Sequence, residues 1–196
     1  MMRVPEREPK VISRSDYKKL LNACLSDQWK AIVCIAYHAG PRRGEVLALE
    51  WCDVDFAANV LNGRNQSHHL TKSRKNRMVP MTHQVAAALR RLRVQILKGN
   101  LVFTNGIGGK IVNNFERAYR KIAKRAGLLG GKGNPRYGLH DLRRSCATEL
   151  QRSGVSMKTT QRILGHANMS TTAKFYARVE DEDLRAAMQR RGKQTA

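Results

Sequence analysis

The sequence predicts a mainly helical α+β domain that contains a small antiparallel β-sheet. Two patterns support this fold class. Apolar residues recur at helical spacing after Ser13, where a Ser-x-x-Asp sequence is typical of a helix start, and from Trp51 the apolar period shifts towards two, as in strands. After Thr82 the helical period returns. At 196 residues, without internal repeats, the chain is long enough to bury a core of its own.

The expected elements follow from these periods and from the turn residues between them. Helices are predicted from Ser13, over Trp29–Ala39, over Gly44–Glu50, from Thr82 to about Leu97, from about Asn113 to Ala126, and in shorter pieces between His140 and Arg191. Strands are expected from Trp51 to about Met81, with turn residues at Asn62-Gly63 and a hairpin over Leu70–Met81. Gly130–Pro135 is a loop by composition.

Positive charge dominates the composition. The 37 Lys and Arg residues exceed the 15 Asp and Glu residues, which gives a net charge of +22 and a pI near 10.7. Between Asp55 and Asp141 the only carboxylate is Glu116, whereas the same stretch holds seventeen basic residues. A surface without a partner normally mixes both signs, so this stretch indicates a face that binds a polyanion through its phosphates. An acidic membrane surface is a weaker alternative because the basic residues do not lie on one amphipathic helix.

Several classes of protein are excluded or disfavoured. No apolar run approaches the roughly 18 residues of a membrane span, and the charged N-terminus is followed by no apolar signal segment, so we expect an intracellular protein without a membrane partner. The cysteines are scattered and form no CxxC pair, which argues against a disulfide framework and a zinc site. They are expected to be small core or surface residues: Cys24, Cys34, Cys52 and Cys146.

Two basic clusters in the first half of the chain are suited to phosphate chemistry. Arg42 and Arg43 follow a Gly-Pro break and precede a predicted helix, where a guanidinium can donate two hydrogen bonds to phosphate oxygens. Lys72 lies in the predicted hairpin among other cations, which lower the pKa of an ammonium and make it a candidate proton donor. Those cations are Arg74, Lys75 and Arg77. Taken alone, the arginine pair is more often an ordinary surface feature, and the lysine cluster is explained equally well by a solvated charged turn.

Three further clusters follow in the second half. His140 and Arg143 are three residues apart, which places them on one face of a helix. His166 follows Gly165, a glycine expected to end a helix. Tyr176 carries a hydroxyl that is a weak nucleophile unless nearby cations and a base favour its oxyanion. Individually, such histidines and tyrosines are more often packing residues.

In this order and spacing, the five clusters resemble the catalytic domain of the tyrosine recombinases, also called the phage integrase family, from about Ile12 to Val179. The resemblance implies that family's fold, with residues 12–179 as the catalytic domain, 1–11 as a leader or linker remnant and 180–196 as a C-terminal helix and basic tail. The implied catalytic residues are Arg42, Lys72, His140, Arg143, His166 and the nucleophile Tyr176, supported by Glu45. The implied DNA-binding residues are Arg43, Arg74, Lys75, Arg77 and Arg144.

Three departures from the family pattern are visible. Pro41 stands where the family usually has an apolar residue such as leucine, and the ten-residue separation of His166 from Tyr176 is at the long end of the family's range. Family members also carry an N-terminal helical domain that grips the far side of the DNA. Only about a dozen residues precede Ser13 here, so we expect an excised domain or a natural fragment.

The implied activity is site-specific recombination and integration of DNA without metal, nucleotide or other cofactor. Tyr176 would attack a phosphodiester and form a 3′-phosphotyrosine, with Arg42 and Arg143 binding the nonbridging oxygens. Lys72 would protonate the leaving 5′-oxygen, and His140 would accept or position the tyrosine proton. His166 would add a hydrogen bond to the phosphate.

The implied partners are double-stranded DNA, further copies of the chain that form a dimer or tetramer on DNA, and accessory DNA-bending or directionality proteins. The tail at 180–196 is expected to dock on a neighbouring copy, or alternatively to fold back on its own domain. The implied location is the cytoplasm and nucleoid of a prokaryote, with a host or phage gene. Two alternatives remain, a type IB topoisomerase-like enzyme and a DNA-binding regulator without catalysis.

Overall fold

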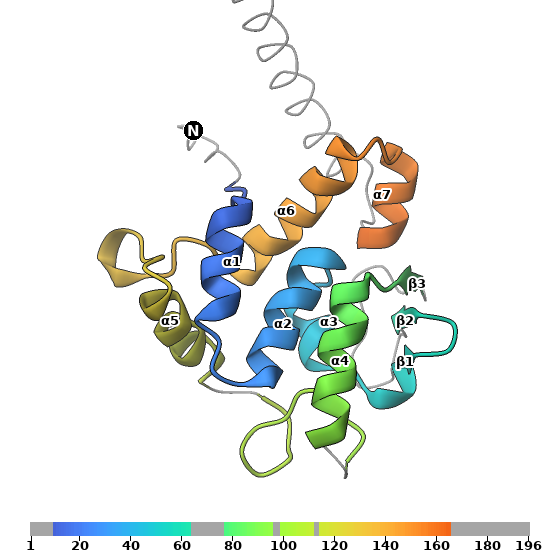
Figure 1. The fold of residues 1–196 in the computed structure, drawn as a ribbon, viewed down its shortest axis with the longest axis horizontal. Coiled ribbons are helices and arrows are strands. Elements are labelled where there is room, and N and C mark those ends of the chain that lie inside the picture. Colours follow the sequence, from blue (N-terminus) through green and yellow to red (C-terminus); the bar gives the residue numbers. More distant parts are fainter. Residues whose placement is uncertain (1–9, 64–76, 96–98, 112–113, 166–196) are drawn as a thin grey trace, which may run out of the picture.

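The computed structural model describes residues 10–63, 77–95, 99–111 and 114–165, and within them it shows a mainly helical domain with one small sheet (Figure 1). The helices are α1 (Arg14–Asn22), α2 (Asp27–His38), α3 (Arg43–Leu47), α4 (His83–Gln95), α5 (Phe115–Arg125), α6 (Leu139–Arg152) and α7 (Met157–Leu164). Two short 3₁₀ helices, η1 (Trp51–Asp53) and η2 (Gly131–Gly133), lie between them. The strands are β1 (Val54–Asp55), β2 (Val60–Gly63) and β3 (Arg77–Pro80). The predicted fold class is confirmed.

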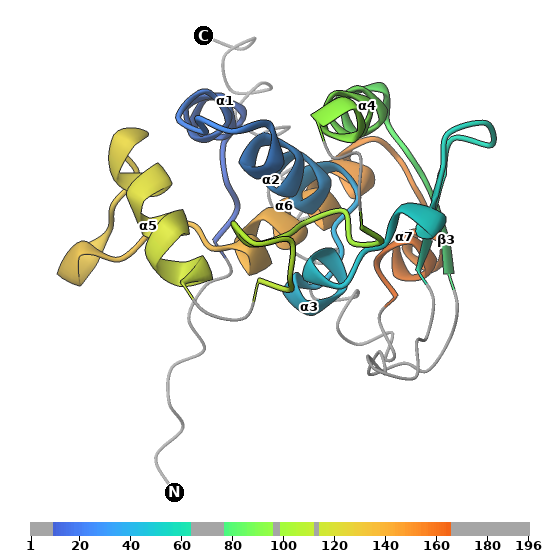
Figure 2. The same cartoon turned by 90° about the horizontal axis from the view of Figure 1, so that it is seen from below.

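Helix α2 forms the centre of the domain. Its residues from Ala31 to Tyr37 are all buried, because a helix that is apolar on every side must be enclosed by other elements. Figure 2 shows α2 between α1, α4 and α6, and it packs against all three. One continuous hydrophobic core extends from Ile12 to Leu142, as expected for a single domain.

The sheet is antiparallel with the strand order β1-β2-β3. Arg77–Pro80, predicted as the return strand of a hairpin, is confirmed as a strand, β3, and it pairs with β2 in the register Gly63↔Arg77 to Val60↔Pro80. The expected outgoing arm, Leu70–Lys72, lies outside the described residues. Leu61 and Val79 are opposite each other and both buried, so one face of the sheet belongs to the core.

Two local expectations in this region were wrong. Asn62 and Gly63 lie inside β2, and the turn that precedes it is made by residues 56–59 instead. The Asp55 carboxylate accepts hydrogen bonds from the backbone N–H groups of Ala57 and Ala58, and Asn59 adopts a positive φ, which together close this turn. The stretch Trp51–Asp53, expected as strand, forms η1, in which the Asp53 carboxylate accepts from the backbone N–H of Glu50.

Other predicted helices are confirmed with small shifts of their ends. Ser13 caps α1 by accepting a hydrogen bond from the backbone N–H of Asp16, as its Ser-x-x-Asp sequence predicts. Gly165 ends α7 in the left-handed conformation.

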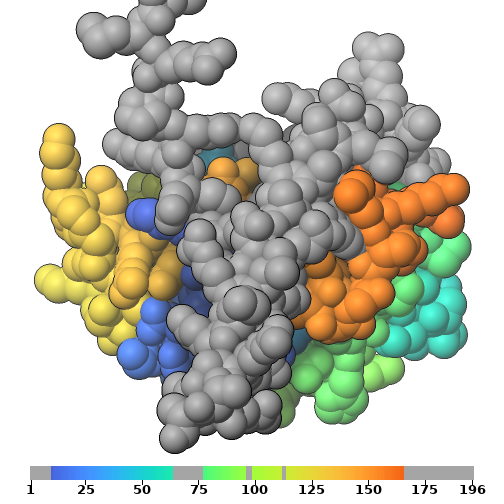
Figure 3. Space-filling view, turned by 90° about the horizontal axis from the view of Figure 1, so that it is seen from above, coloured from blue at the N-terminus to red at the C-terminus, as the bar shows by residue number. Residues whose placement is uncertain are grey.

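In Figure 3 the surfaces of α6 and α7 (orange) meet the green and cyan surfaces of α4 and the strands, and α7 contacts β3. No helix in the described ranges has the length and apolar character needed to cross a membrane.

Cys24, Cys34 and Cys146 are buried, Cys52 is exposed, and all four carry free thiols. This confirms the expectation that they are small core or surface residues. Residues 1–9 of the predicted leader, 1–11, and the whole of the predicted tail, 180–196, lie outside the described residues.

Candidate active site

Arg42 is held in place by the turn that joins α2 to α3. Gly40 has a φ of +61°, and a side chain there would place its Cβ 2.5 Å from Leu164 Cδ2, so only glycine lets this turn approach the end of α7. Arg42 is the N-cap residue of α3. Its backbone N–H donates to Glu45 Oε2 at 2.8 Å and its Nη1 donates to Glu45 Oε1 at 2.9 Å. One carboxylate therefore fixes both the backbone and the guanidinium of Arg42.

Arg143 reaches the same place from α6. Its side chain is almost fully enclosed, with 3% of the residue exposed. The guanidinium donates one hydrogen bond to the carbonyl oxygen of Gly40 and another to that of Leu164 at 2.8 Å. Helix α6 and the Gly40 turn are joined by this residue, which sets the distance between the Arg42 and Arg143 side chains.

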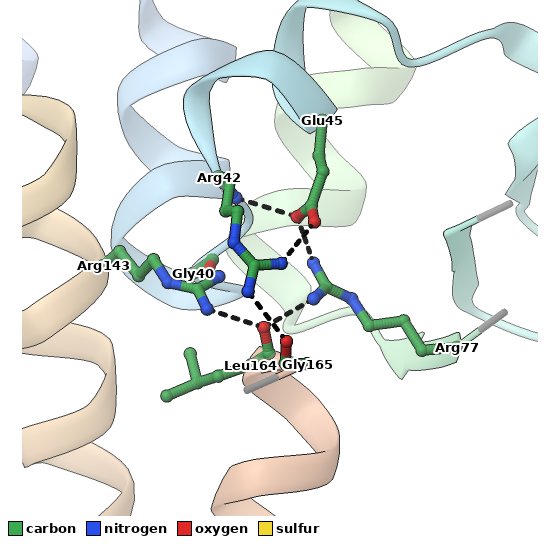
Figure 4. Close-up of polar contacts among 7 residues, drawn as sticks. All are labelled: Gly40, Arg42, Glu45, Arg77, Arg143, Leu164 and Gly165. Atoms are coloured by element: carbon green, nitrogen blue, oxygen red, sulfur yellow. Dashed lines mark hydrogen bonds and ion pairs between the residues drawn. The ribbon is translucent and has the colours of Figure 1, made fainter. Parts of the chain in front are cut away.

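A third guanidinium, that of Arg77 at the start of β3, joins the group. Its Nη2 lies 2.6 Å from Glu45 Oε2, and its Nη1 donates to the carbonyl oxygen of Leu164 at 2.5 Å. Figure 4 shows all three guanidiniums at the carbonyl oxygens that end α7, with Arg42 and Arg77 also on the Glu45 carboxylate. Arg42 Nη2 completes this set with a hydrogen bond of 3.0 Å to Gly165 O.

The C-terminal end of α7 attracts these cations for a general reason. The last carbonyls of a helix lack intrahelical partners and carry partial negative charge. A guanidinium can both donate hydrogen bonds to these carbonyls and balance their negative charge, because it has five N–H donors and a permanent positive charge. The carbonyl of Leu164 is shared by Arg77 and Arg143.

The charges of the cluster do not cancel. Among the described residues, the cluster holds three guanidiniums and one carboxylate, which pairs with Arg42 and Arg77, so two positive charges are left in excess. Burial raises the pKa of Glu45, but the positive charge of Arg77 and the hydrogen bonds from Arg42 outweigh it and hold that pKa below its usual range. Burial, together with the charges of Arg42 and Arg77, lowers the pKa of Arg143 to about 10, which still leaves it protonated at neutral pH. An excess of fixed cations in a partly enclosed place suits a phosphate group.

His140 lies in the first turn of α6, one turn before Arg143, as the spacing predicted. Its pKa is lowered by partial burial and by the neighbouring charges of Arg144 and Arg143. A lowered pKa favours the neutral imidazole, which has a nitrogen free of a proton, as a base needs. Arg144 is paired with Asp141 at 3.1 Å on the same helix.

Arg43 points to a different neighbour from Arg42. Its Nη1 forms an ion pair of 2.5 Å with Glu116 on α5, and both side chains are more than half exposed. The guanidinium also lies 6.0 Å from the ring centroid of Phe115. Of the two adjacent arginines, the structure brings Arg42 to Arg143 and leaves Arg43 at the surface.

The remaining predicted site residues cannot be placed in the same way. Lys72, Arg74, Lys75, His166 and Tyr176 lie outside the described residues. In the sequence, Gly165 directly precedes His166, and Arg77 follows Lys72 by five residues. In the parts of the chain that are described, no group of three or more His, Cys, Asp or Glu side chains could hold a metal ion.

Sequence reasoning missed the central position of Arg77, which it placed with the DNA-binding residues of the hairpin. The alternation of side chains along a strand could have predicted that Arg77 points inward. Arg77 and Val79 lie two residues apart on a strand and so share a face, and Val79 is buried while Met78 between them is 66% exposed. The alternation of β3 directs Arg77 inward.

Comparisons with known proteins identify the family of the chain. The model of the phage integrase family matches residues 10–183. A tyrosine recombinase XerC-like protein of Caldanaerobacter subterraneus subsp. tengcongensis is 30% identical over 207 residues, which cover 89% of this chain and 51% of that protein. The chain spans between 51% and 63% of the length of three curated relatives that it matches.

Solved structures show the same fold. The crystal structure of XerA recombinase has a TM-score of 0.73 and 28% identity, over 93% of this chain and 65% of that one. The Tn1549 transposon integrase in complex with a circular intermediate DNA has a TM-score of 0.74 and 19% identity, over 93% of this chain and 68% of that one. With the family model matching nearly the whole chain, the protein belongs to the phage integrase family.

Proposed function

We propose that this chain contains the catalytic domain of a site-specific DNA recombinase that cleaves and rejoins DNA through a covalent 3′-phosphotyrosine. The observation that carries the proposal is the convergence of Arg42 and Arg143 on the end of α7, directly before His166 and close in sequence to Tyr176. Two cations fixed by carbonyls and a carboxylate form a preorganised site for a phosphate whose charge grows in the transition state. Structures of related proteins solved as complexes with DNA support the choice of substrate.

The chemical step uses side chains of the chain alone. The Tyr176 oxygen attacks the phosphorus of a phosphodiester, and the bond from phosphorus to the 5′-oxygen breaks. His140 takes the tyrosine proton, and Lys72 supplies a proton to the departing 5′-oxygen. The phosphate remains as an ester of the tyrosine, so the reverse attack by a 5′-hydroxyl of another strand rejoins DNA without an external energy source.

The arginines have donors left for this phosphate. Each guanidinium has five N–H donors, and the hydrogen bonds described for Arg143 and for the Arg42 side chain use two in each case. The remaining donors can hold the two nonbridging oxygens. Glu45 supports Arg42 and takes no part in proton transfer, since it is engaged by Arg42 and Arg77.

Capture of a covalent adduct tests the proposal. Nicked duplexes of random sequence are incubated with the full chain, and DNA joined to protein is recovered after denaturation. The expected result is an adduct with the wild-type chain and none with Tyr176→Phe, which lacks only the attacking oxygen and should bind DNA equally well. An adduct of normal yield from Tyr176→Phe would refute the assignment of the nucleophile.

The proposed role of Lys72 needs a different substrate. Lys72→Ala should cleave ordinary DNA slowly and recover on DNA whose bridging 5′-oxygen is replaced by sulfur, because a thiolate leaves without a proton. The cleavage rates of both substrates by both proteins are compared under single-turnover conditions. An equal defect on the sulfur substrate would assign Lys72 an electrostatic or structural role.

The same adduct separates the proposal from its alternatives. A regulator without catalysis forms no adduct. A type IB topoisomerase-like enzyme forms one but reseals the original strand, whereas a recombinase joins its adduct to the 5′-hydroxyl of a second duplex. Transfer of label from one duplex to another is therefore the expected outcome here.

The proposed partners are double-stranded DNA, further copies of the chain on DNA, and accessory bending or directionality proteins, all in a prokaryotic cytoplasm and nucleoid. The proposed domain comprises 12–179, and the segment 180–196 is proposed to dock on a neighbouring copy. Removal of residues 180–196 should weaken cooperative assembly on DNA with two sites and leave binding to one site unchanged. Equal cooperativity after truncation would show that the tail acts within its own copy or not at all.

A further inference from the structure

Arg77 does not have the surroundings of an ordinary phosphate contact. Its side chain is 15% exposed, and both amino groups of its guanidinium are engaged, one with Glu45 and the other with the carbonyl of Leu164. An arginine that contacts the DNA backbone outside the catalytic site, as expected for Arg43, keeps its guanidinium open to solvent. The geometry instead directs the Arg77 side chain into the protein.

The contacts of Arg77 join three separate parts of the chain. Arg77 itself begins β3, Glu45 belongs to α3, and Leu164 ends α7, so the two hydrogen bonds span 32 and 87 residues of sequence. In the described residues the contact between β3 and α7 places the strand beside that helix end. The Arg77 side chain thereby links the position of β3 to that of the Glu45 carboxylate, which in turn orients Arg42.

Gly165 is adapted to this approach. It has a φ of +66°, and a Cβ built on it would overlap Arg77 Nη1. A residue with a side chain would therefore displace the guanidinium as well as strain the backbone. Glycine at position 165 therefore lets Arg77 take the position that it has against the last turn of α7.

We propose that Arg77 is a positioning residue that acts as a clamp: it fastens β3 to the end of α7 and holds Glu45 in place for Arg42. This inference rests on the proposed function, because it assigns Arg77 to the same site. Lysine cannot replace it, since one ammonium lacks the planar fork that reaches a carboxylate and a carbonyl together. Loss of the clamp leaves the catalytic side chains present but displaced, and small displacements of this kind slow a reaction about tenfold to a hundredfold.

Two substitutions and a matched control test the inference in the full chain. Arg77→Met removes the charge and the fork, Arg77→Lys keeps the charge only, and Arg91→Met removes an exposed charge from α4, which Figure 2 shows on the opposite side of the domain from α3 and α7. Three quantities are measured for each: the salt dependence of affinity for a random duplex, the single-turnover cleavage rate at saturating DNA, and the hydrogen exchange of backbone amides at 163–165.

The expected pattern differs between a clamp and a phosphate contact. For a clamp, the cleavage rate at saturating DNA falls about tenfold to a hundredfold in both Arg77 variants, the salt slope is unchanged in Arg77→Lys, and exchange at 163–165 accelerates in both. Arg91→Met shows none of these changes. Rates restored by saturating DNA, together with a salt slope lowered by about one in Arg77→Met, would overturn the inference and make Arg77 a phosphate contact.

Failure of the proposed function would look different. If the wild-type chain forms no adduct with any duplex, recombination is refuted, yet the salt slope and the hydrogen exchange still report on Arg77. Unchanged exchange at 163–165 in Arg77→Met and Arg77→Lys would refute the clamp even if the wild-type chain cleaves DNA. Arg77→Lys keeps the charge that compensates Glu45, so it provides the result if Arg77→Met does not fold.

Discussion

The guanidiniums of Arg42, Arg77 and Arg143 are enclosed by protein groups, whereas Arg43, one residue from the first of them, forms an exposed ion pair with Glu116. The enclosed group is held by a carboxylate and by the carbonyls that end α7. The exposed pair is open to solvent and to salt, which screens such interactions. Under the proposed function, the surroundings of an arginine, and not its residue type, decide whether it positions a reacting group or adds to overall affinity.

The energetic consequences of the two regions also differ. Fixed donors in a partly enclosed site act on the transition state, so their loss appears in the rate of cleavage. Exposed cations act on any phosphate nearby through the release of counterions, so their loss appears in the salt dependence of binding. Substitutions that keep or remove one charge in each region can therefore sharpen this distinction or break it.

The largest effect is expected from Arg143→Lys. The lysine keeps the positive charge but cannot hold the carbonyls of Gly40 and Leu164 and the phosphate at once. The cleavage rate should fall on the order of a hundredfold to a thousandfold, with little change in DNA affinity. The measurement is single-turnover formation of the covalent adduct at saturating DNA.

Arg152→Lys is the matched control for this prediction, because Arg152 lies on the same helix in a more exposed pair with Glu149 at 3.6 Å. Its cleavage rate should stay close to that of the wild-type chain. Equal losses in both variants would show that enclosure of the guanidinium has no special part in cleavage.

A smaller effect, on stability, is expected from Glu45→Gln. Removal of this carboxylate leaves three neighbouring guanidiniums without the acid that pairs with two of them, and loss of one partner of a buried pair costs about 3 kcal/mol of unfolding free energy. Because the pKa of Glu45 is lowered in the folded state, its contribution is present above its ordinary pKa and is lost as the pH falls through the lowered value.

Urea unfolding of both proteins over a series of acidic pH values checks this expectation. The wild-type chain should lose stability on acidification more steeply than Glu45→Gln, so the two curves converge at low pH. Glu149→Gln, which affects a pair with an exposed partner, Arg14, should change the unfolding free energy less. Parallel curves for the wild-type chain and Glu45→Gln would mean that Glu45 does not balance the cluster.

The fold class and most helices could be predicted from the sequence because they depend on local signals. Ser13 predicted the start of α1, Gly165 the end of α7, and the apolar run from Trp29 the buried α2. The sheet region was predicted less well. Asn62 and Gly63 resemble a turn in composition, but their pairing with Met78 and Arg77 places them in β2. Strand pairing is a long-range property that no local period reveals.

Part of the site was accessible from the sequence for the same reason. The His140 and Arg143 spacing places both on one face of α6, and the Gly-Pro break before Arg42 marks its turn. The carbonyl acceptors of Gly40 and Leu164 were not accessible, because every residue has such a group and only the tertiary structure selects two of them. The convergence of Arg77 on Glu45 depends on the pairing of β3 and on the position of α7, which are both long-range.

The smallest effect on stability is expected in the exposed region, from Glu116→Gln. The pair with Arg43 is largely solvent-exposed, so its loss should change the unfolding free energy by less than about 1 kcal/mol. DNA binding should nevertheless strengthen, because Glu116 is the only acid between Asp55 and Asp141 and its removal frees Arg43 for a phosphate. The salt slope of binding to a random duplex should become steeper by about one. Arg43→Gln should make the slope shallower by a similar amount, and a slope unchanged in both variants would place this face of α3 and α5 away from the DNA.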